Sequence, residues 1–158
     1  MVSDDVMDAF VCIIQNSLRI VPYRYKKRVS ITRPLVLFMS MQGDAHDTTM
    51  AIIGDAACNL HDVEIVILPI IMNGHFHVVV LDNDKQEYRH HSSCQSKKYD
   101  KDALEMRNLF ELCIDMEFGE SATAKYPLVH DTETPRQKTR KCRLCRLCDA
   151  VYRAVTRR

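Results

Sequence analysis

The residues of this sequence that could carry out chemistry begin with two histidines, His75 and His77. They lie two positions apart in a run of apolar, mostly β-branched residues, so on a strand both side chains point to the same face. A neutral imidazole in such a place could act as a general base, and two together could hold a metal ion. No carboxylate accompanies them at the spacing of a known metal motif. Residue type alone therefore favours a pair of hydrogen-bonded structural histidines.

The seven cysteines are an odd number, so they cannot all form disulfides with one another. Cys12, Cys58 and Cys113 sit among apolar residues, and we expect them to be small buried hydrophobes in a reducing compartment. The other four lie in polar or basic surroundings where a thiol could react. These four are Cys94, Cys142, Cys145 and Cys148.

The last segment of the sequence combines cysteines with positive charge. In Cys142-x-x-Cys145-x-x-Cys148 the spacing is that of a zinc half-site, but a fourth ligand and a second half-site are missing. Residues 136–158 hold nine Lys or Arg and one acid, a charge of +8, which leaves −7 for the remainder of a chain whose net charge is +1. A zinc or nucleic-acid interaction tail is thus one interpretation. A solvated basic terminus with only non-specific affinity is the one that we favour.

The elements that must position these residues begin with helices. Apolar residues at helical spacing predict a first helix over residues 4–18, with capping and acidic side chains at its start and Pro22 beyond its end. Residues 23–33 are basic and are expected to form a loop, and residues 47–59 fit a second helix.

The centre of the chain predicts three strands in close succession. Residues 64–70 are rich in β-branched side chains, residues 75–82 follow an Asn-Gly turn signal, and residues 86–91 follow a polar turn. Strands joined by such short turns pair antiparallel.

A further helix and a polar region follow the strands. Asp100 is a capping residue type and precedes a helical pattern over residues 101–116. Residues 119–141 are expected to be mostly loop, with a short strand at 126–129. Helices, then strands, then helices indicate an α+β fold with a mainly antiparallel sheet and flanking helices.

Composition sets the broad class. The chain has 158 residues, of which 46% are hydrophobic and 27% charged, enough for one hydrophobic core in a single domain. No apolar run reaches the length of a membrane span, and the first residues are acidic where a secretory signal is basic. We therefore expect an intracellular protein.

The strand at residues 75–82 resembles the signature strand of the SUMO-protease (ubiquitin-like-protein-specific) cysteine peptidase family. In that family a catalytic His followed by Trp opens a strand that ends in Asp. Phe76 takes the place of the Trp, and the seven-residue separation between His75 and Asp82 matches the family.

Three other segments resemble the same family in the same order. Residues 3–10 look like its "Leu-Asn-Asp-x-x-Ile-x-x-Phe" opening, and residues 66–70 are similar to the strand that precedes the catalytic His. Pro135-Arg136-Gln137 looks like the "Pro-x-Gln" that supplies the glutamine of the oxyanion hole. The resemblance spans residues 3 to about 150.

This resemblance implies a papain-like cysteine protease fold and acyl transfer through a cysteine thiolate. It implies that His75 is the general base and that the Gln137 amide stabilises the oxyanion. The family nucleophile lies about six residues after that glutamine, at a helix N-terminus that favours thiolate. Cys142, five residues on, is the first candidate, and Cys145 is the second.

Two positions depart from the family pattern. The family places an acid seventeen residues after the catalytic His, and here that position is Ser92. Serine can accept a hydrogen bond from imidazole but cannot stabilise imidazolium by charge. Cys142 lies between Lys141 and Arg143, where the family has Asp and Gly, although cationic neighbours still favour a thiolate. We therefore expect weak or absent activity.

The sequence as a whole predicts one α+β cysteine-type peptidase domain over residues 1–158, with an atypical basic segment at 136–158. The expected reaction is hydrolysis of the bond after the C-terminal glycine of a ubiquitin-like modifier. The alternatives are a non-catalytic binding module that keeps the fold, and the zinc or nucleic-acid tail. We expect a monomer in the nucleus or cytoplasm whose partner is the modifier or its conjugate, with no membrane, nucleic acid, cofactor or metal.

Overall fold

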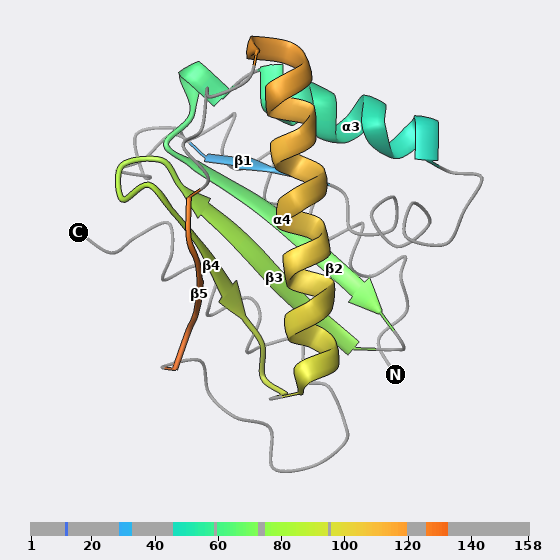
Figure 1. Ribbon diagram of the computed structural model, residues 1–158, viewed down its shortest axis with the longest axis vertical. Helices are drawn as coiled ribbons and strands as arrows, with labels where there is room; N and C mark the ends of the chain where they lie inside the picture. Colours follow the sequence, from blue (N-terminus) through green and yellow to red (C-terminus); the bar gives the residue numbers. More distant parts are fainter. Residues whose placement is uncertain are drawn as a thin grey trace.

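The computed structural model describes residues 29–32, 46–58, 60–72, 75–94, 96–119 and 126–132, together with Cys12. Its elements are a mixture of short strands, two helices and one 3-10 turn (Figure 1). In chain order they are β1 (Val29–Ile31), α3 (His46–Cys58), η2 (Leu60–Asp62), β2 (Ile65–Met72), β3 (His75–Asp82), β4 (Glu87–His91), α4 (Lys97–Phe118) and β5 (Leu128–His130).

The five strands form one sheet in the order β1-β2-β3-β4-β5 (Figure 1). The three middle strands pair antiparallel, which confirms the prediction for residues 64–91. The two outer strands pair parallel to their neighbours, so the sheet is mixed. The α+β class is therefore confirmed, with parallel pairs at both edges that the sequence did not predict.

β1 lies inside the segment that was expected to be a loop, and that prediction was wrong. Its three residues are too few to show an alternating pattern, and basic residues precede them. Parallel pairing with β2, where Ser30 lies beside Val66, supplies the hydrogen bonds that make the segment a strand. The short strand expected at 126–129 is present as β5, one or two residues further along the chain.

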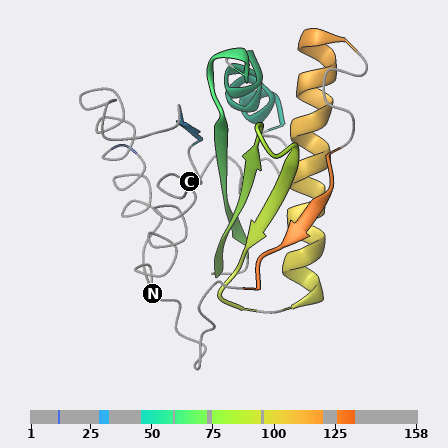
Figure 2. The same ribbon diagram turned by 90° about the vertical axis from the view of Figure 1, so that its left-hand side faces the viewer.

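The hydrophobic core lies between the sheet and the two helices: α4 covers one face of the sheet, and α3 packs against α4 near one end of the strands (Figure 2). On that face, alternate residues of β2 and β3 pack against the helices, among them Val66, Leu68, Val79 and Leu81. The residues between them, such as Ile67 and Val80, are buried as well. Burial on both faces is the reason that these strands have almost continuous apolar sequences.

α4 is longer than predicted, and Ser96 caps it, not Asp100. The Ser96 hydroxyl accepts a hydrogen bond from the Lys98 amide at 3.3 Å. Asp100 lies in the first turn, where its amide donates to the Ser96 carbonyl at 3.1 Å. Serine and aspartate can both cap a helix. The first residues of α4, Lys97 and Lys98, show no apolar periodicity, so nothing in the sequence pattern indicates that the helix begins before Asp100. At the other end, Gly119 has a φ of 85°, and its amide donates to the Asp115 carbonyl at 2.9 Å.

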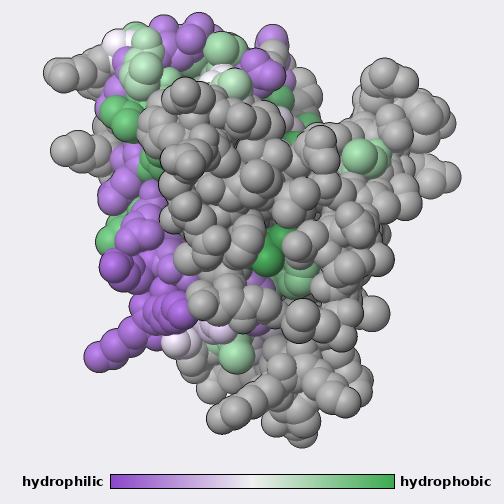
Figure 3. Space-filling model, turned by 90° about the vertical axis from the view of Figure 1, so that its right-hand side faces the viewer, coloured by the Kyte–Doolittle hydropathy of each residue, from purple (hydrophilic) through white to green (hydrophobic). Residues whose placement is uncertain are grey.

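The outward face of α4 is mainly charged. In Figure 3 hydrophilic side chains form a band along the side of the molecule on which α4 lies, with small hydrophobic patches between them. Three apolar side chains of α4 are exposed, namely Leu104, Leu112 and Met116. The inward face carries Met106 and Phe110, which are fully buried. This is the amphipathic pattern of a helix that covers one face of a sheet.

The second predicted helix is confirmed as α3, but one cysteine in it is placed differently from the prediction. Ala57 is fully buried and Cys58, the next residue, is exposed, because successive residues of a helix differ in direction by about 100°. Cys12 is exposed too, and Cys113 is buried as expected. The prediction of burial was therefore wrong for Cys12 and Cys58.

Apart from Cys12, the residues of the helix expected at 4–18 lie outside the described residues, and so does the segment 136–158. Among the residues that are described, no helix combines the length and the apolar character that crossing a membrane requires.

Candidate active site

His75 is the first residue of β3, and Ser92 directly follows β4. His75 Nε2 lies 3.1 Å from Ser92 Oγ. The antiparallel pairing of β3 and β4 brings together two residues that are seventeen positions apart in the sequence. Val79 and His90 are directly opposite each other on β3 and β4, on the face of the sheet that α4 covers. His75 and Ser92 lie an even number of residues from them, so their side chains are on the same face.

The hydrogen bonds of Ser92 fix the direction of its bond with His75. The Ser92 hydroxyl donates its one proton to the Cys94 carbonyl, at 2.7 Å, and accepts from the Cys94 amide at 3.2 Å. A serine hydroxyl has one proton and two lone pairs. It therefore accepts from His75, whose proton sits on Nε2. The lone pair of the neutral ring is then on Nδ1, which is the atom that can take a proton.

The surroundings of His75 favour its neutral form. The side chain is buried, and the Tyr99 ring of α4 lies 4.3 Å from it between ring centroids. The His77 ring is nearly parallel to that of His75, with 5.9 Å between centroids. Burial removes water from the imidazole and lowers its pKa below the usual value. An uncharged His75 can act as a base at neutral pH.

The acid that ends the same strand does not reach His75. Asp82 is at the other end of β3, seven residues away, or roughly 23 Å along a strand. Its carboxylate accepts from the Lys85 amide at 3.2 Å and lies 3.0 Å from the Lys85 ammonium. Within the described part of the chain, Ser92 is the hydrogen-bond partner of the His75 ring. This partner is uncharged.

A chain of histidines runs from His77 towards the edge of the sheet. His77 Nδ1 lies 2.9 Å from His90 Nε2, and His90 Nδ1 lies 3.1 Å from His130 Nδ1. Asp100 Oδ1 is 3.4 Å from that His90 nitrogen and 3.3 Å from that of His130. Burial lowers the pKa of His77 well below its usual value and that of His90 to about 4, where His130 adds to the effect and Asp100 opposes it.

His90, His130 and Tyr99 were not expected at a site, and Asp100 was expected only as a helix cap. His90, Asp100 and His130 come from β4, α4 and β5, so no local spacing connects them. His90 could have been found from the strand pattern, because it lies two residues after Tyr88 and so points to the same, inward face of β4.

A second Asp–His pair lies at the same edge of the sheet. His91 Nδ1 is 2.8 Å from Asp131 Oδ2, and both side chains are largely buried. Burial lowers the pKa of His91, although the Asp131 carboxylate opposes that change. His91 alternates with His90 and therefore points to the other face of the sheet, away from His75.

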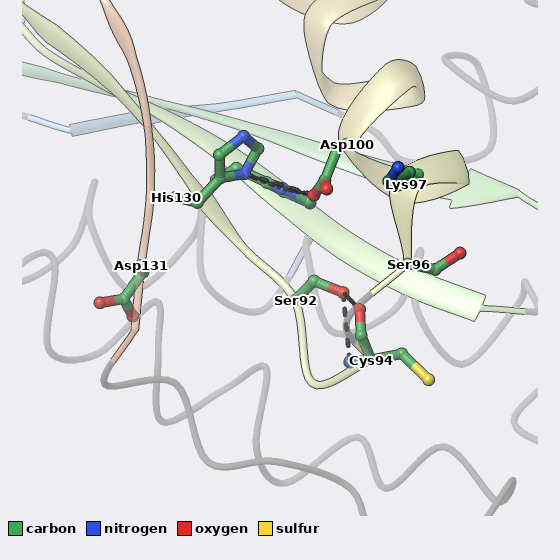
Figure 4. Close-up of a pocket in the computed structure, with 8 residues that line it drawn as sticks. Ser92, Cys94, Ser96, Lys97, Asp100, His130 and Asp131 are labelled. Carbon is green, nitrogen blue, oxygen red and sulfur yellow. Dashed lines mark hydrogen bonds and ion pairs between the residues drawn. The ribbon is translucent and has the colours of Figure 1, made fainter.

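An open pocket of about 440 Å³ lies between the end of β4, the start of α4 and β5 (Figure 4). In Figure 4 the Asp100 carboxylate points from the helix toward His130, while Ser92 and Cys94 hydrogen bond to each other lower in the view. The pocket lies beside Ser92 and is lined by polar and charged side chains.

The other predicted site residues lie outside the described part of the chain. They are Gln137, Cys142 and the alternative nucleophile Cys145. Their roles, and the catalytic roles of His75 and Ser92, stay predictions.

Comparison with known structures identifies the class of protein that has this fold. No protein-family model matches the sequence, and no curated protein matches it. Solved structures do match: the fold is that of the catalytic domain of SUMO proteases, a papain-like cysteine protease fold.

The particular structures are those of the SUMO protease Ulp1. The chain is similar to Ulp1 with its catalytic cysteine oxidised to a sulfonic acid, with a TM-score of 0.65, 11% identity, and coverage of 96% of this chain and 65% of that one. It is similar to the C-terminal Ulp1 protease domain in complex with Smt3, the yeast orthologue of SUMO, with a TM-score of 0.62, 11% identity, and coverage of 87% and 58%. The chain thus spans less than two thirds of the length of these proteins, and at this identity the likeness shows the fold.

Proposed function

We propose that this chain is a cysteine-type peptidase domain that hydrolyses the bond after the C-terminal glycine of a ubiquitin-like modifier, at a rate limited by its uncharged orienting group. The observation that carries the proposal is the hydrogen bond between His75 Nε2 and Ser92 Oγ on this fold. That bond leaves Nδ1 of a buried, neutral imidazole as the proton acceptor.

The proposed reaction is acyl transfer. The Cys142 thiol gives its proton to His75 Nδ1, and the thiolate attacks the carbonyl carbon of the glycine. The Gln137 side-chain amide donates a hydrogen bond to the oxyanion that forms. The imidazolium then returns its proton to the leaving amine, and water hydrolyses the thioester so that the free thiol is restored.

Ser92 supports only part of this sequence of steps. Its hydroxyl holds the His75 ring in one tautomer, as an aspartate does, but it adds no negative charge to stabilise the imidazolium. Loss of that charge costs a few kcal/mol of transition-state stabilisation, or roughly a hundredfold or more in rate. We therefore expect slow turnover.

The second candidate is a binding module that keeps the fold and recognises the modifier without cleaving it. The observation that favours it is the same serine: among the described residues, no carboxylate hydrogen bonds to the His75 ring. In both cases the expected partner is a modifier of the kind bound in the Ulp1–Smt3 structure, and the expected location is the nucleus or cytoplasm.

The test is covalent labelling by a SUMO probe that carries an electrophile at its C-terminal glycine. We expect slow labelling that Cys142→Ala and His75→Ala both abolish, with Cys145→Ala near the wild-type rate. Cys12→Ala and His61→Ala are matched controls, because both residues are exposed and neither belongs to the proposed site.

Three results would change the conclusion. Labelling that needs Cys145 but not Cys142 would identify Cys145 as the nucleophile. Labelling that His75→Ala leaves unchanged would mean a merely exposed thiol. An absence of labelling, with the modifier still bound in a calorimetric titration, would establish the binding module.

A further inference from the structure

Three metal-ligating groups from three different elements converge at the edge of the sheet. They are His90 Nδ1 from β4, Asp100 Oδ1 from the first turn of α4, and His130 Nδ1 from β5. The two nitrogens are 3.1 Å apart, and the carboxylate oxygen is 3.4 Å from the first and 3.3 Å from the second. Asp100 and His130 point toward each other in Figure 4.

These distances are those of one face of a metal tetrahedron. In a tetrahedral zinc site with bonds of about 2.0–2.1 Å, neighbouring ligand atoms lie roughly 3.3–3.4 Å apart. All three separations here are close to that value, so the spacing of the three atoms fits a single ion.

The ligand types select the class of ion. Two neutral imidazoles and one carboxylate give a net charge of −1, which attracts a dication. Imidazole suits zinc, cobalt and nickel, whereas magnesium and calcium require mainly oxygen ligands. Three protein ligands leave a fourth position, and the adjoining pocket can supply it with water.

The neighbours of the three residues hold them in place. His90 is buried, and its other ring nitrogen is 2.9 Å from His77 Nδ1, the kind of outer contact that orients a metal-bound imidazole. His130 is fixed by its pairing with His90 and by the hydrogen bond from the Asp131 amide to the His90 carbonyl at 2.9 Å. Asp100 is fixed by its place in the capped first turn of α4.

We propose that His90, Asp100 and His130 form a binding site for a divalent transition metal ion of the zinc class, with water as the fourth ligand. Such an ion joins β4, α4 and the edge strand β5. None of the three ligands is a proposed catalytic residue, although Ser92 lines the same pocket, and metal binding does not depend on peptidase activity. Sequence spacing predicts no metal here, because the ligands are ten and thirty residues apart on different elements.

The experiment must separate this site from the three tail cysteines. The full chain with Cys142, Cys145 and Cys148 changed to Ser is stripped with a chelator and titrated with cobalt(II). A tetrahedral site of nitrogen and oxygen ligands gives visible d–d absorption without the near-ultraviolet charge-transfer band of a cobalt–thiolate bond. We expect one equivalent to bind with that spectrum and zinc to displace it.

Ligand variants in the same background complete the test. The side chains of Asp100 and His130 are 46% and 51% exposed, so Asp100→Asn and His130→Gln should leave the fold intact, which circular dichroism checks. Each is expected to weaken cobalt binding by at least about tenfold. His61→Gln, an exposed histidine of η2, is the matched control and should bind as tightly as the parent.

The same variants define the opposing outcome. The proposal is overturned if the parent with the three serines binds no cobalt, if its spectrum shows thiolate ligation, or if Asp100→Asn and His130→Gln bind as tightly as the parent.

Discussion

At His75 the hydrogen bond to Ser92 determines which ring nitrogen carries the proton, whereas the charge of the ring depends on burial. The serine has used its own proton on the Cys94 carbonyl, so it can only accept from the imidazole. Burial under Tyr99 then keeps the ring neutral. In the proposed mechanism such a ring has its Nδ1 free to accept a proton, but nothing charged stabilises the imidazolium that forms.

Ser92→Asp should supply the missing charge. A carboxylate at this distance stabilises imidazolium, so the pKa of His75 should rise and labelling by the modifier probe should become faster. Titration of the His75 ring protons by NMR measures the first effect.

Ser93→Asp is the control, because it adds the same charge one residue along the chain. An equal rise in the pKa of His75 in both variants would mean a general effect of charge, and no rise in Ser92→Asp would contradict the direct contact.

The proximity of two residues could be predicted from the sequence only where the pairing of two neighbouring strands determines it. The spacing of His75 and Ser92 on neighbouring strands can be read from the sequence, and the two are in contact. Tyr99 and Asp100 could not be placed in the same way, because their positions depend on where α4 begins and how it packs on the sheet. Sequence periodicity does not determine a docking angle between elements.

Among the elements, α4 contributes most visibly to the core. Met106, Phe110 and Ile114 are fully buried at helical spacing, while Leu112 on the opposite side is 50% exposed. Phe110 and Leu112 are thus a buried and an exposed apolar residue two positions apart in the same helix. Replacing each of them by alanine distinguishes the effect of core packing from that of helix propensity.

Phe110→Ala should lower the free energy of unfolding by about 3–5 kcal/mol, because it removes a large buried side chain and leaves a cavity. Leu112→Ala should change it by less than about 0.5–1 kcal/mol. Urea denaturation followed by circular dichroism measures both. Equal losses in the two variants would contradict the orientation of α4 on the sheet.

The longer elements could be predicted from sequence, whereas of the two three-residue strands β5 was expected and β1 was not. β2, β3, β4, α3 and α4 each carry a local pattern of five or more residues, and all five were expected. β1 and β5 have three residues each, and their identity as strands depends on partners far along the chain. Such pairing is a tertiary effect, which overrides local preference.

At the scale of the whole molecule, charge is divided unevenly along the chain. Residues 136–158 carry +8 and the remaining residues −7. Such a segment attracts phosphate through counterion release, without any sequence preference.

Binding of the full chain to a labelled DNA duplex should therefore be weak and should fall steeply with salt. Fluorescence anisotropy over a series of salt concentrations measures it, and each phosphate contact should contribute about −0.9 to the slope of log affinity against log salt. A duplex of unrelated sequence is the control. A tight complex that resists salt and prefers one sequence would instead indicate a nucleic-acid-binding tail.

The parallel pairing of the two outer strands has a consequence for the order in which the protein folds. In the antiparallel pairs Met72 meets His75 and Asp82 meets Glu87, so the chain closes loops of only a few residues. At the edges Val29 meets Ile65 and Tyr88 meets Leu128, which are 36 and 40 residues apart. Closing these longer loops costs roughly 2 kcal/mol more in chain entropy, for three residue pairs each.

Low-cost local pairing precedes distant pairing when a small domain folds. The β2–β3–β4 meander should therefore form first, and β5 should join after α4 has docked. Because His130 belongs to β5, the cluster of His90, Asp100 and His130 is completed only in the last step. An ion that binds all three residues would then bind preferentially to the chain that has finished folding.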